Sequence, residues 1–286
     1  EVVGKTIPPK KLGLFFAWRQ ALGGLAGIVG SLVVGWMLAA GSPLAFPYNY
    51  GVLLGLGVIL VAGGLAAFGN VAEPEDTDTR PATSVLSQIR RGAQAFRSDG
   101  NFRHFISLRS SLMIAGAATP FFAVYVQQRL GGAPGMVGVY LAVYTVSSLL
   151  SNVIYGRFSA QWGNRRTMAV AASAGLAMTC FVLVLAIAAP LLNLSGAVAS
   201  WWLIPVFALS GLRESGVGVA GQSLLLDISP VAERSLYLGF TNSLLGIVLF
   251  ATTLSGVVVQ SFGFMTLLTL TLLAHAFAVT AALRMR

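Results

Sequence analysis

Long apolar runs separated by short polar turns dominate the chain. A helix of about 20 apolar residues is long enough to cross the hydrocarbon core of a bilayer, which is about 30 Å thick. Lipid offers the backbone no hydrogen-bond partner, so each run is expected to be a helix; the runs are too long, and alternate too little, for barrel strands. The pattern predicts an all-α polytopic membrane protein with eight transmembrane helices, at Leu14–Gly41, Tyr50–Asn70, His104–Gln128, Gly135–Tyr155, Thr167–Pro190, Ser200–Leu226, Ser235–Gln260 and Phe262–Leu283.

Composition supports a lipid environment. Of the 286 residues, 56% are hydrophobic and 9% are charged, whereas soluble domains carry about 25% charged residues. The formal net charge of +9 does not indicate nucleic acid, because the basic residues lie in short turns rather than on one continuous surface. The single cysteine, Cys180, lies in an apolar run, which excludes a disulfide framework or a cysteine metal site within one chain.

The distribution of lysine and arginine predicts the orientation. Arg19, Arg109 and Arg213 lie within apolar runs, and Arg129 lies in a turn on one side of the membrane. All other basic residues fall in turns or ends on the opposite side. Since positively charged loops remain in the cytoplasm, both ends of the chain are expected to be cytoplasmic, in the cell (inner) membrane.

A polar segment, residues 71–103, interrupts the apolar pattern. It begins with four acidic residues between positions 73 and 78. Its second part, Ser84–Ser98, places Val85, Ile89, Ala93 and Phe96 near one helical face. This pattern predicts a linker followed by an amphipathic helix on the cytoplasmic membrane surface. The alternative is a solvated linker with a transient helix.

A weak internal repeat suggests how the runs are grouped. The segment that starts at Pro8 aligns with the one that starts at Pro230, pairing Leu14 with Leu236 and Gly24 with Gly246. Six runs lie between the two segments, which favours a repeat unit of six helices. Residues 1–70 would then be the last two helices of one unit, residues 71–103 the linker and residues 104–286 a complete second unit. We expect four further helices before Glu1.

A loop motif carries a resemblance to a known family. The stretch from Gly156 to Arg166 reads GRFSAQWGNRR. It resembles the Gly-x-x-x-Asp-x-x-Gly-x-Arg-Arg loop signature of the major facilitator superfamily, with Gly156, Gly163, Arg165 and Arg166 as matches. Ala160 departs from it, standing where the family has a carboxylate that helps to lock one conformation. The resemblance implies a twelve-helix fold, of which this chain holds helices 5–12, with two bundles that rock about a central site.

Ionisable residues within the apolar runs are the main candidates for chemistry, because burial of a charge in a membrane is costly. The resemblance implies that the helices carrying Arg109, Arg213 and Glu214 line the central cavity. Arg213 would bind an anionic solute group or neutralise a neighbouring carboxylate. Glu214 is a candidate proton carrier, and Arg109 would bind solute or reach the cytoplasmic headgroups. For Arg213 and Glu214 the alternative is a structural ion pair between helices.

Several uncharged or weakly basic residues are secondary candidates. Gln127, Gln222 and Asn242 are placed to hydrogen-bond a solute if their helices line the cavity. His275 is expected to serve helix packing. Pro120 should kink its helix, because proline removes one hydrogen bond and clashes with the preceding turn.

The sequence favours a transporter over an enzyme. It contains no phosphate-binding loop, no Gly-x-Ser-x-Gly elbow and no zinc-protease motif, so no catalytic residue, cofactor or metal is predicted. The predicted function is secondary active or facilitative transport of a small solute by alternating access, with H+ as a candidate coupling ion. The expected partners are the lipid bilayer and the solute. The alternative is a scaffold or receptor that keeps the fold without transport.

Overall fold

A computed structural model describes residues 9–39, 41–71 and 84–285. Within these ranges, side chains are described except at positions 9–21, 85 and 232. Pro8, the acidic part of the linker and the side chain of Arg19 therefore lie outside the described residues. All regular structure in the described ranges is helical, as the apolar pattern predicts.

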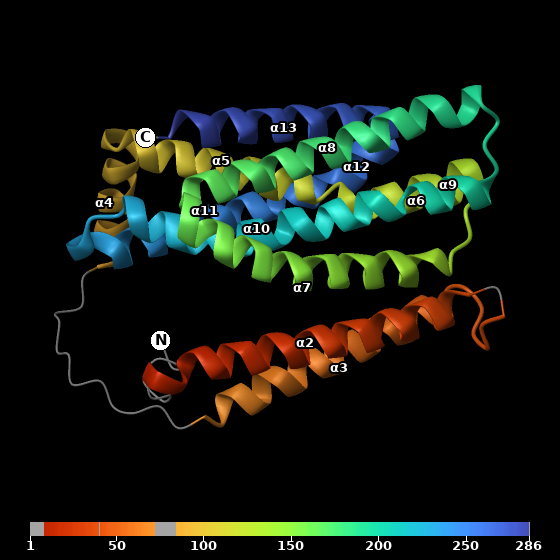
Figure 1. Cartoon of the computed structure of the whole chain (residues 1–286), viewed down its shortest axis with the longest axis horizontal. Helices are drawn as coiled ribbons and strands as arrows, with labels where there is room; N and C mark the ends of the chain where they lie inside the picture. Colours follow the sequence, from red (N-terminus) through yellow and green to blue (C-terminus); the bar gives the residue numbers. More distant parts are fainter. Residues whose placement is uncertain (1–8, 40, 72–83, 286) are drawn as a thin grey trace. The chain divides into compact units, whose positions relative to one another are not determined.

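The chain divides into two compact units (Figure 1). The first comprises Glu1–Ala82 and Ala133–Ala142, and the second comprises Thr83–Gly132 and Val143–Arg286. The first contains α2 (Pro9–Leu38) and α3 (Tyr48–Gly69), which are joined by a hydrogen bond from Asn49 Nδ2 to Met37 O at 3.4 Å. Most side chains of α3 are exposed although its mean hydropathy is 2.3, as expected where lipid covers a helix.

The second unit contains the remaining helices, and α7 enters it from the first. In chain order they are α4 (Val85–Ser98), α5 (Gly100–Gly116), α6 (Thr119–Leu130), α7 (Met136–Trp162), α8 (Asn164–Leu191), α9 (Gly196–Trp202), α10 (Ile204–Ile228), α11 (Arg234–Thr252), α12 (Leu254–Phe262) and α13 (Phe264–Arg284). Helix α8 packs against α10 and α13, and α13 packs against α5 (Figure 1). Their shared core includes Phe105, Leu108, Met168 and Leu224.

Small residues bring α7 and α10 close together. A Cβ atom on Gly211 would lie 2.9 Å from Ser148 N and closer still to Tyr144 O. Two hydrogen bonds hold the same pair of helices, from Ser147 Oγ to Ala208 O at 2.6 Å and from Ser215 Oγ to Asn152 Oδ1 at 2.8 Å. Close backbone approach with polar links is the usual packing of membrane helices. Lipid removes the hydrophobic drive for helix association, so small residues that allow tight packing and interhelical hydrogen bonds take its place.

Three of the predicted spans consist of two helices in succession. The break between α5 and α6 lies at Ala117–Ala118, the break between α9 and α10 at Leu203 and the break between α11 and α12 at Thr253. The first break follows from Pro120, which cannot donate to the carbonyl of Gly116, where α5 ends. The predicted kink is therefore present as a helix break one turn before the proline.

Seven helical segments in the described ranges are long and apolar enough to cross a membrane. They match seven of the eight predicted runs, from Tyr48–Gly69 through Phe264–Arg284. In α2 the described apolar segment, Leu22–Leu38, is shorter than a full span. The division into eight spans therefore stays a prediction.

The amphipathic pattern in the linker does form a helix. Helix α4 covers Val85–Ser98, against the predicted Ser84–Ser98. It packs on α11 and α5: Gly92 lies against the ring of Phe240, and Phe96 lies 6.4 Å from Phe102, between ring centroids. Leu86 and Ile89 remain exposed. Protein therefore covers part of the apolar face that the sequence analysis assigned to the membrane surface.

Candidate functional site

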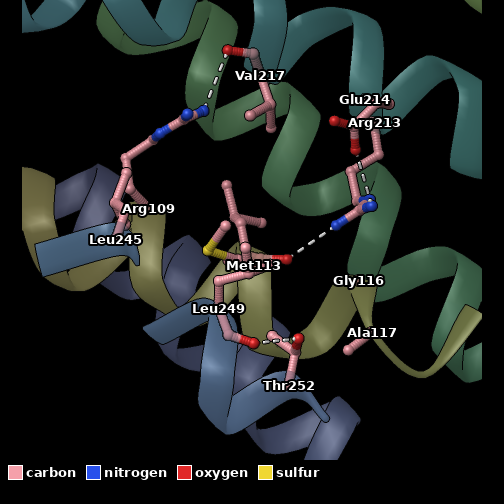
Figure 2. Close-up of a pocket in the computed structure, with 11 residues that line it drawn as sticks. Arg109, Met113, Gly116, Ala117, Arg213, Glu214, Val217, Leu245, Leu249 and Thr252 are labelled. Atoms are coloured by element: carbon pink, nitrogen blue, oxygen red, sulfur yellow. Dashed lines mark hydrogen bonds and ion pairs between the residues drawn. The ribbon is translucent and has the colours of Figure 1, made fainter. Parts of the chain in front are cut away.

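A pocket of about 320 Å³ lies in the second unit, where α5, α10 and α11 meet (Figure 2). Its wall combines three charged side chains with apolar ones. It is lined by Arg109, Leu112, Met113, Gly116 and Ala117 from α5 and the α5–α6 break, by Arg213, Glu214 and Val217 from α10, and by Leu245, Leu249 and Thr252 from α11. Concave sites of this size with a few convergent polar groups are typical of small-molecule binding.

Arg213 crosses from α10 to the backbone of α5. Its Nη1 donates to the carbonyl oxygen of Leu112 at 2.9 Å, and its Nη2 donates to Glu214 Oε2 at 3.0 Å. The side chain of Arg213 is 7% exposed and that of Glu214 is 50% exposed. The ion pair therefore joins a buried cation to a half-exposed carboxylate, and both line the pocket.

Arg109 makes the opposite crossing, from α5 to the backbone of α10. Its Nη1 donates to the carbonyl oxygen of Val217 at 3.3 Å (Figure 2). Among the described residues Arg109 forms no ion pair, and the side chain is only partly buried. The two arginines thus tie α5 and α10 together reciprocally, and their charges meet at one pocket.

Glycines four residues after each acceptor make this exchange possible. A Cβ on Gly116 would lie 2.8 Å from Arg213 Nη1, and a Cβ on Gly221 would lie 2.8 Å from Arg109 Nη1. In a helix the side chain at position i+4 points back over the carbonyl of position i. With glycine there, the carbonyls of Leu112 and Val217 are open to a second donor in addition to the helix amide.

A third glycine, Gly175, packs against the aliphatic part of the Arg213 side chain. Gly175 on α8 lies against the ring of His275, and its Cβ would be 2.9 Å from Arg213 Cδ. His275 is fully buried, with Nδ1 3.0 Å from Thr179 Oγ1. This supports the packing role expected for His275. It also shows that the aliphatic part of Arg213 packs against α8 while its guanidinium binds the backbone of α5.

The other solute-site candidates do not reach this pocket. Gln222 on α10 and Asn242 on α11 are exposed, and Gln127 on α6 is partly buried away from the pocket wall. Their proposed contact with a solute stays a prediction. In the described part of the chain, no three histidine, cysteine, aspartate or glutamate side chains gather as a metal site would require.

The loop motif covers the end of α7, a one-residue joint at Gly163 and the start of α8. Gly163 has φ 83° and ψ 160°, a conformation essentially restricted to glycine. Arg165 Nη2 donates to Leu283 O at 3.0 Å, and Arg166 lies over the Trp162 ring at 5.4 Å. Gly156 lies inside α7, so the helix continues through most of the segment that the sequence analysis placed in a turn.

A carboxylate outside the motif reaches this joint. Asn164 Nδ2 donates to Asp227 Oδ2, at the end of α10, at 2.7 Å. The motif position without a carboxylate, Ala160, is exposed on α7. Sequence reasoning missed Asp227 because its link to Asn164 spans 63 positions, and it missed Gly116 and Gly221 because glycine is common throughout this chain.

The apolar helices indicate an integral membrane protein, and its second unit holds a pocket with three charged side chains. A family model described as Major Facilitator Superfamily matches residues 105–286. The chain belongs to this family, whose members generally transport solutes across membranes rather than act as enzymes. Comparisons with curated proteins and with solved structures gave no match.

Proposed function

We propose that the protein is a secondary active or facilitative transporter that works by alternating access, with the pocket between α5, α10 and α11 as its solute site. The observation that carries this proposal is the reciprocal arginine pair beside an exposed carboxylate, inside helices that are apolar enough to span a membrane. Charges in such helices are costly and are retained chiefly for function.

The three charged residues have different proposed roles. Arg213 is largely buried and bonded on two sides, so it positions α5 against α10. Arg109, with one backbone hydrogen bond, contacts the solute. Glu214 is half-exposed beside the pocket and is the candidate carrier if transport is coupled to H+. Gln127, Gln222 and Asn242 are proposed to contact the solute at positions outside this pocket.

The proposed architecture follows the six-helix repeat. Residues 104–286 form a complete six-helix bundle, residues 1–70 supply the last two helices of another, and residues 71–103 join them. The family match over 105–286 supports the first of these assignments. The charge distribution supports cytoplasmic ends in the cell (inner) membrane. We further propose that the joint carrying Gly156, Gly163, Arg165 and Arg166 takes part in gating.

Ligand binding followed by uptake separates transport from the alternative. A thermal-shift screen of metabolites on the full-length protein identifies a ligand, and proteoliposomes are then tested for its uptake. We expect saturable uptake that falls at least tenfold in Arg109→Gln and persists in Arg129→Gln, which removes an exposed charge outside the pocket. A ligand that binds through Arg109 without being taken up would instead identify a scaffold or receptor. Collapse of uptake on adding a protonophore would establish H+ coupling.

A further inference from the structure

The balance of charge in the pocket indicates which solutes it accepts. Two guanidinium groups and one carboxylate line it in the described part of the chain. Glu214 forms its ion pair with Arg213, and among the described residues no carboxylate lies within ion-pair distance of Arg109, although Glu214 is near enough to act on both charges. The pocket therefore keeps one excess positive charge. An unpaired cation in a low-dielectric site attracts an anion strongly.

Hydrogen-bonding capacity points in the same direction. A guanidinium group has five N–H donors, and Arg109 uses one, on Val217 O. Its remaining donors suit the oxygens of a carboxylate or another oxyanion, which arginine binds through two parallel hydrogen bonds. Arg213 has less to offer, because two of its nitrogens are committed and the side chain is buried.

Apart from Thr252, the rest of the wall is apolar. Met113 from α5 and Leu245 and Leu249 from α11 line the same pocket as Arg109, whose guanidinium points to Val217 (Figure 2). An inorganic anion would leave these side chains without a partner, whereas a hydrocarbon body would bury them. The volume of about 320 Å³ suits a small molecule.

We propose that the pocket takes a small organic monoanion, with its oxyanion head on Arg109 and its apolar body against Met113, Leu245 and Leu249. A monoanion balances the single excess positive charge, and a cation is repelled by it. This inference rests on the proposed function, because it takes the pocket as the solute site. It adds the chemical class of the solute.

The charge preference is measurable without knowing the natural solute. Thr252, which lines the pocket, is replaced by Cys in a background where the exposed Cys180 is replaced by Ser. In detergent, the labelling rates of this cysteine with an anionic sulfonatoethyl and a cationic trimethylammonioethyl methanethiosulfonate are compared. Leu192→Cys, at an exposed turn, provides the reference ratio.

We expect the anionic-to-cationic rate ratio at Thr252→Cys to exceed the reference by about tenfold, as one excess unit charge on the wall of the same pocket predicts at an effective dielectric constant of about 20. Arg109→Gln should remove this excess, and the matched charge change Arg129→Gln should preserve it. Gly221→Ala places a Cβ 2.8 Å from Arg109 Nη1, which displaces the guanidinium without removing its charge, and should lower the ratio. Benzoate should slow the labelling of Thr252→Cys, and neutral benzamide should not.

A ratio at Thr252→Cys no higher than the reference overturns the proposal. So does equal protection by benzamide and benzoate. In detergent the reagents reach the protein from both of its membrane faces, so these results do not depend on alternating access. Failure of the proposed function would show separately, as a bound ligand that is not taken up into proteoliposomes.

Discussion

Replacing Gly116 with Ala tests whether Arg213 holds α5 and α10 together as described. The new Cβ would lie 2.8 Å and 2.9 Å from the two terminal nitrogens of Arg213. Ordinary contact begins at about 3.4 Å, so the guanidinium must retreat by about 0.5 Å. It cannot do so freely, because Gly175 on α8, which is itself in contact with His275, packs against its stem. The 2.9 Å hydrogen bond to Leu112 O is therefore stretched or lost.

The magnitude follows from two opposing terms. A buried hydrogen bond from a charged donor contributes about 1.5–3 kcal/mol, whereas alanine favours a helix over glycine by about 1 kcal/mol. The net loss is about 0.5–2 kcal/mol, which corresponds to a fall in Tm of about 1–8 °C for a bundle of this size. Thermal unfolding of the purified protein in detergent measures it.

Gly218→Ala is the matched control for this prediction. Gly218 lies in α10 with no other atom within 4 Å of its Cβ position, so only the gain in helix propensity remains. We expect its Tm to equal or exceed that of the unmodified protein. If Gly116→Ala is as stable as Gly218→Ala, Arg213 is not held on the α5 backbone and the description of the site is wrong.

Three further substitutions test the packing around the site. Gly211→Ala should reduce the yield of monodisperse protein severalfold, measured by size-exclusion chromatography. The new Cβ meets the backbone of α7, which cannot move aside as a side chain can, so a normal yield would contradict this close packing. Phe240→Ala should raise amide hydrogen exchange in α4 severalfold, because the Phe240 ring packs against Gly92 and Phe96. Glu233→Gln removes the exposed 3.3 Å ion pair with Arg91 and should leave this exchange nearly unchanged. Equal exchange in the two variants would show that aromatic packing does not hold α4. Asp227→Ala breaks an exposed contact with Asn164 and should shift Tm by less than about 3 °C; a larger fall would mean that this contact is coupled to the core.

The apolar pattern predicted most of the fold because lipid imposes one solution on it. Runs of apolar residues in a membrane must satisfy their own backbone, and the helix is the way to do so within one segment. The apolar pattern does not predict where the helices end or break. The interruption at Ala117–Ala118 follows from Pro120, but the break at Thr253 has no proline near it, and the sequence offered no signal for it.

The charged part of the site was also predictable, since Arg109, Arg213 and Glu214 are ionisable residues within apolar runs. Their arrangement was not. Arg109 reaches Val217 O and Arg213 reaches Leu112 O across 108 and 101 positions of the chain, respectively. Such contacts depend on the register of two packed helices, which one sequence does not specify. Gln222 and Asn242 illustrate the same point, because their polarity suggested the cavity and the structure places them outside the pocket wall.

Access to the pocket from each side of a membrane tests alternating access most directly. Thr252→Cys, without Cys180, is reconstituted in the full-length protein in sealed proteoliposomes, and the impermeant sulfonatoethyl reagent is added outside or trapped inside. We predict labelling from both sides. Phe250→Cys, at an apolar position that is 77% exposed in the protein and that we expect lipid to cover, should react from neither. Labelling of Thr252→Cys from one side only would contradict the account.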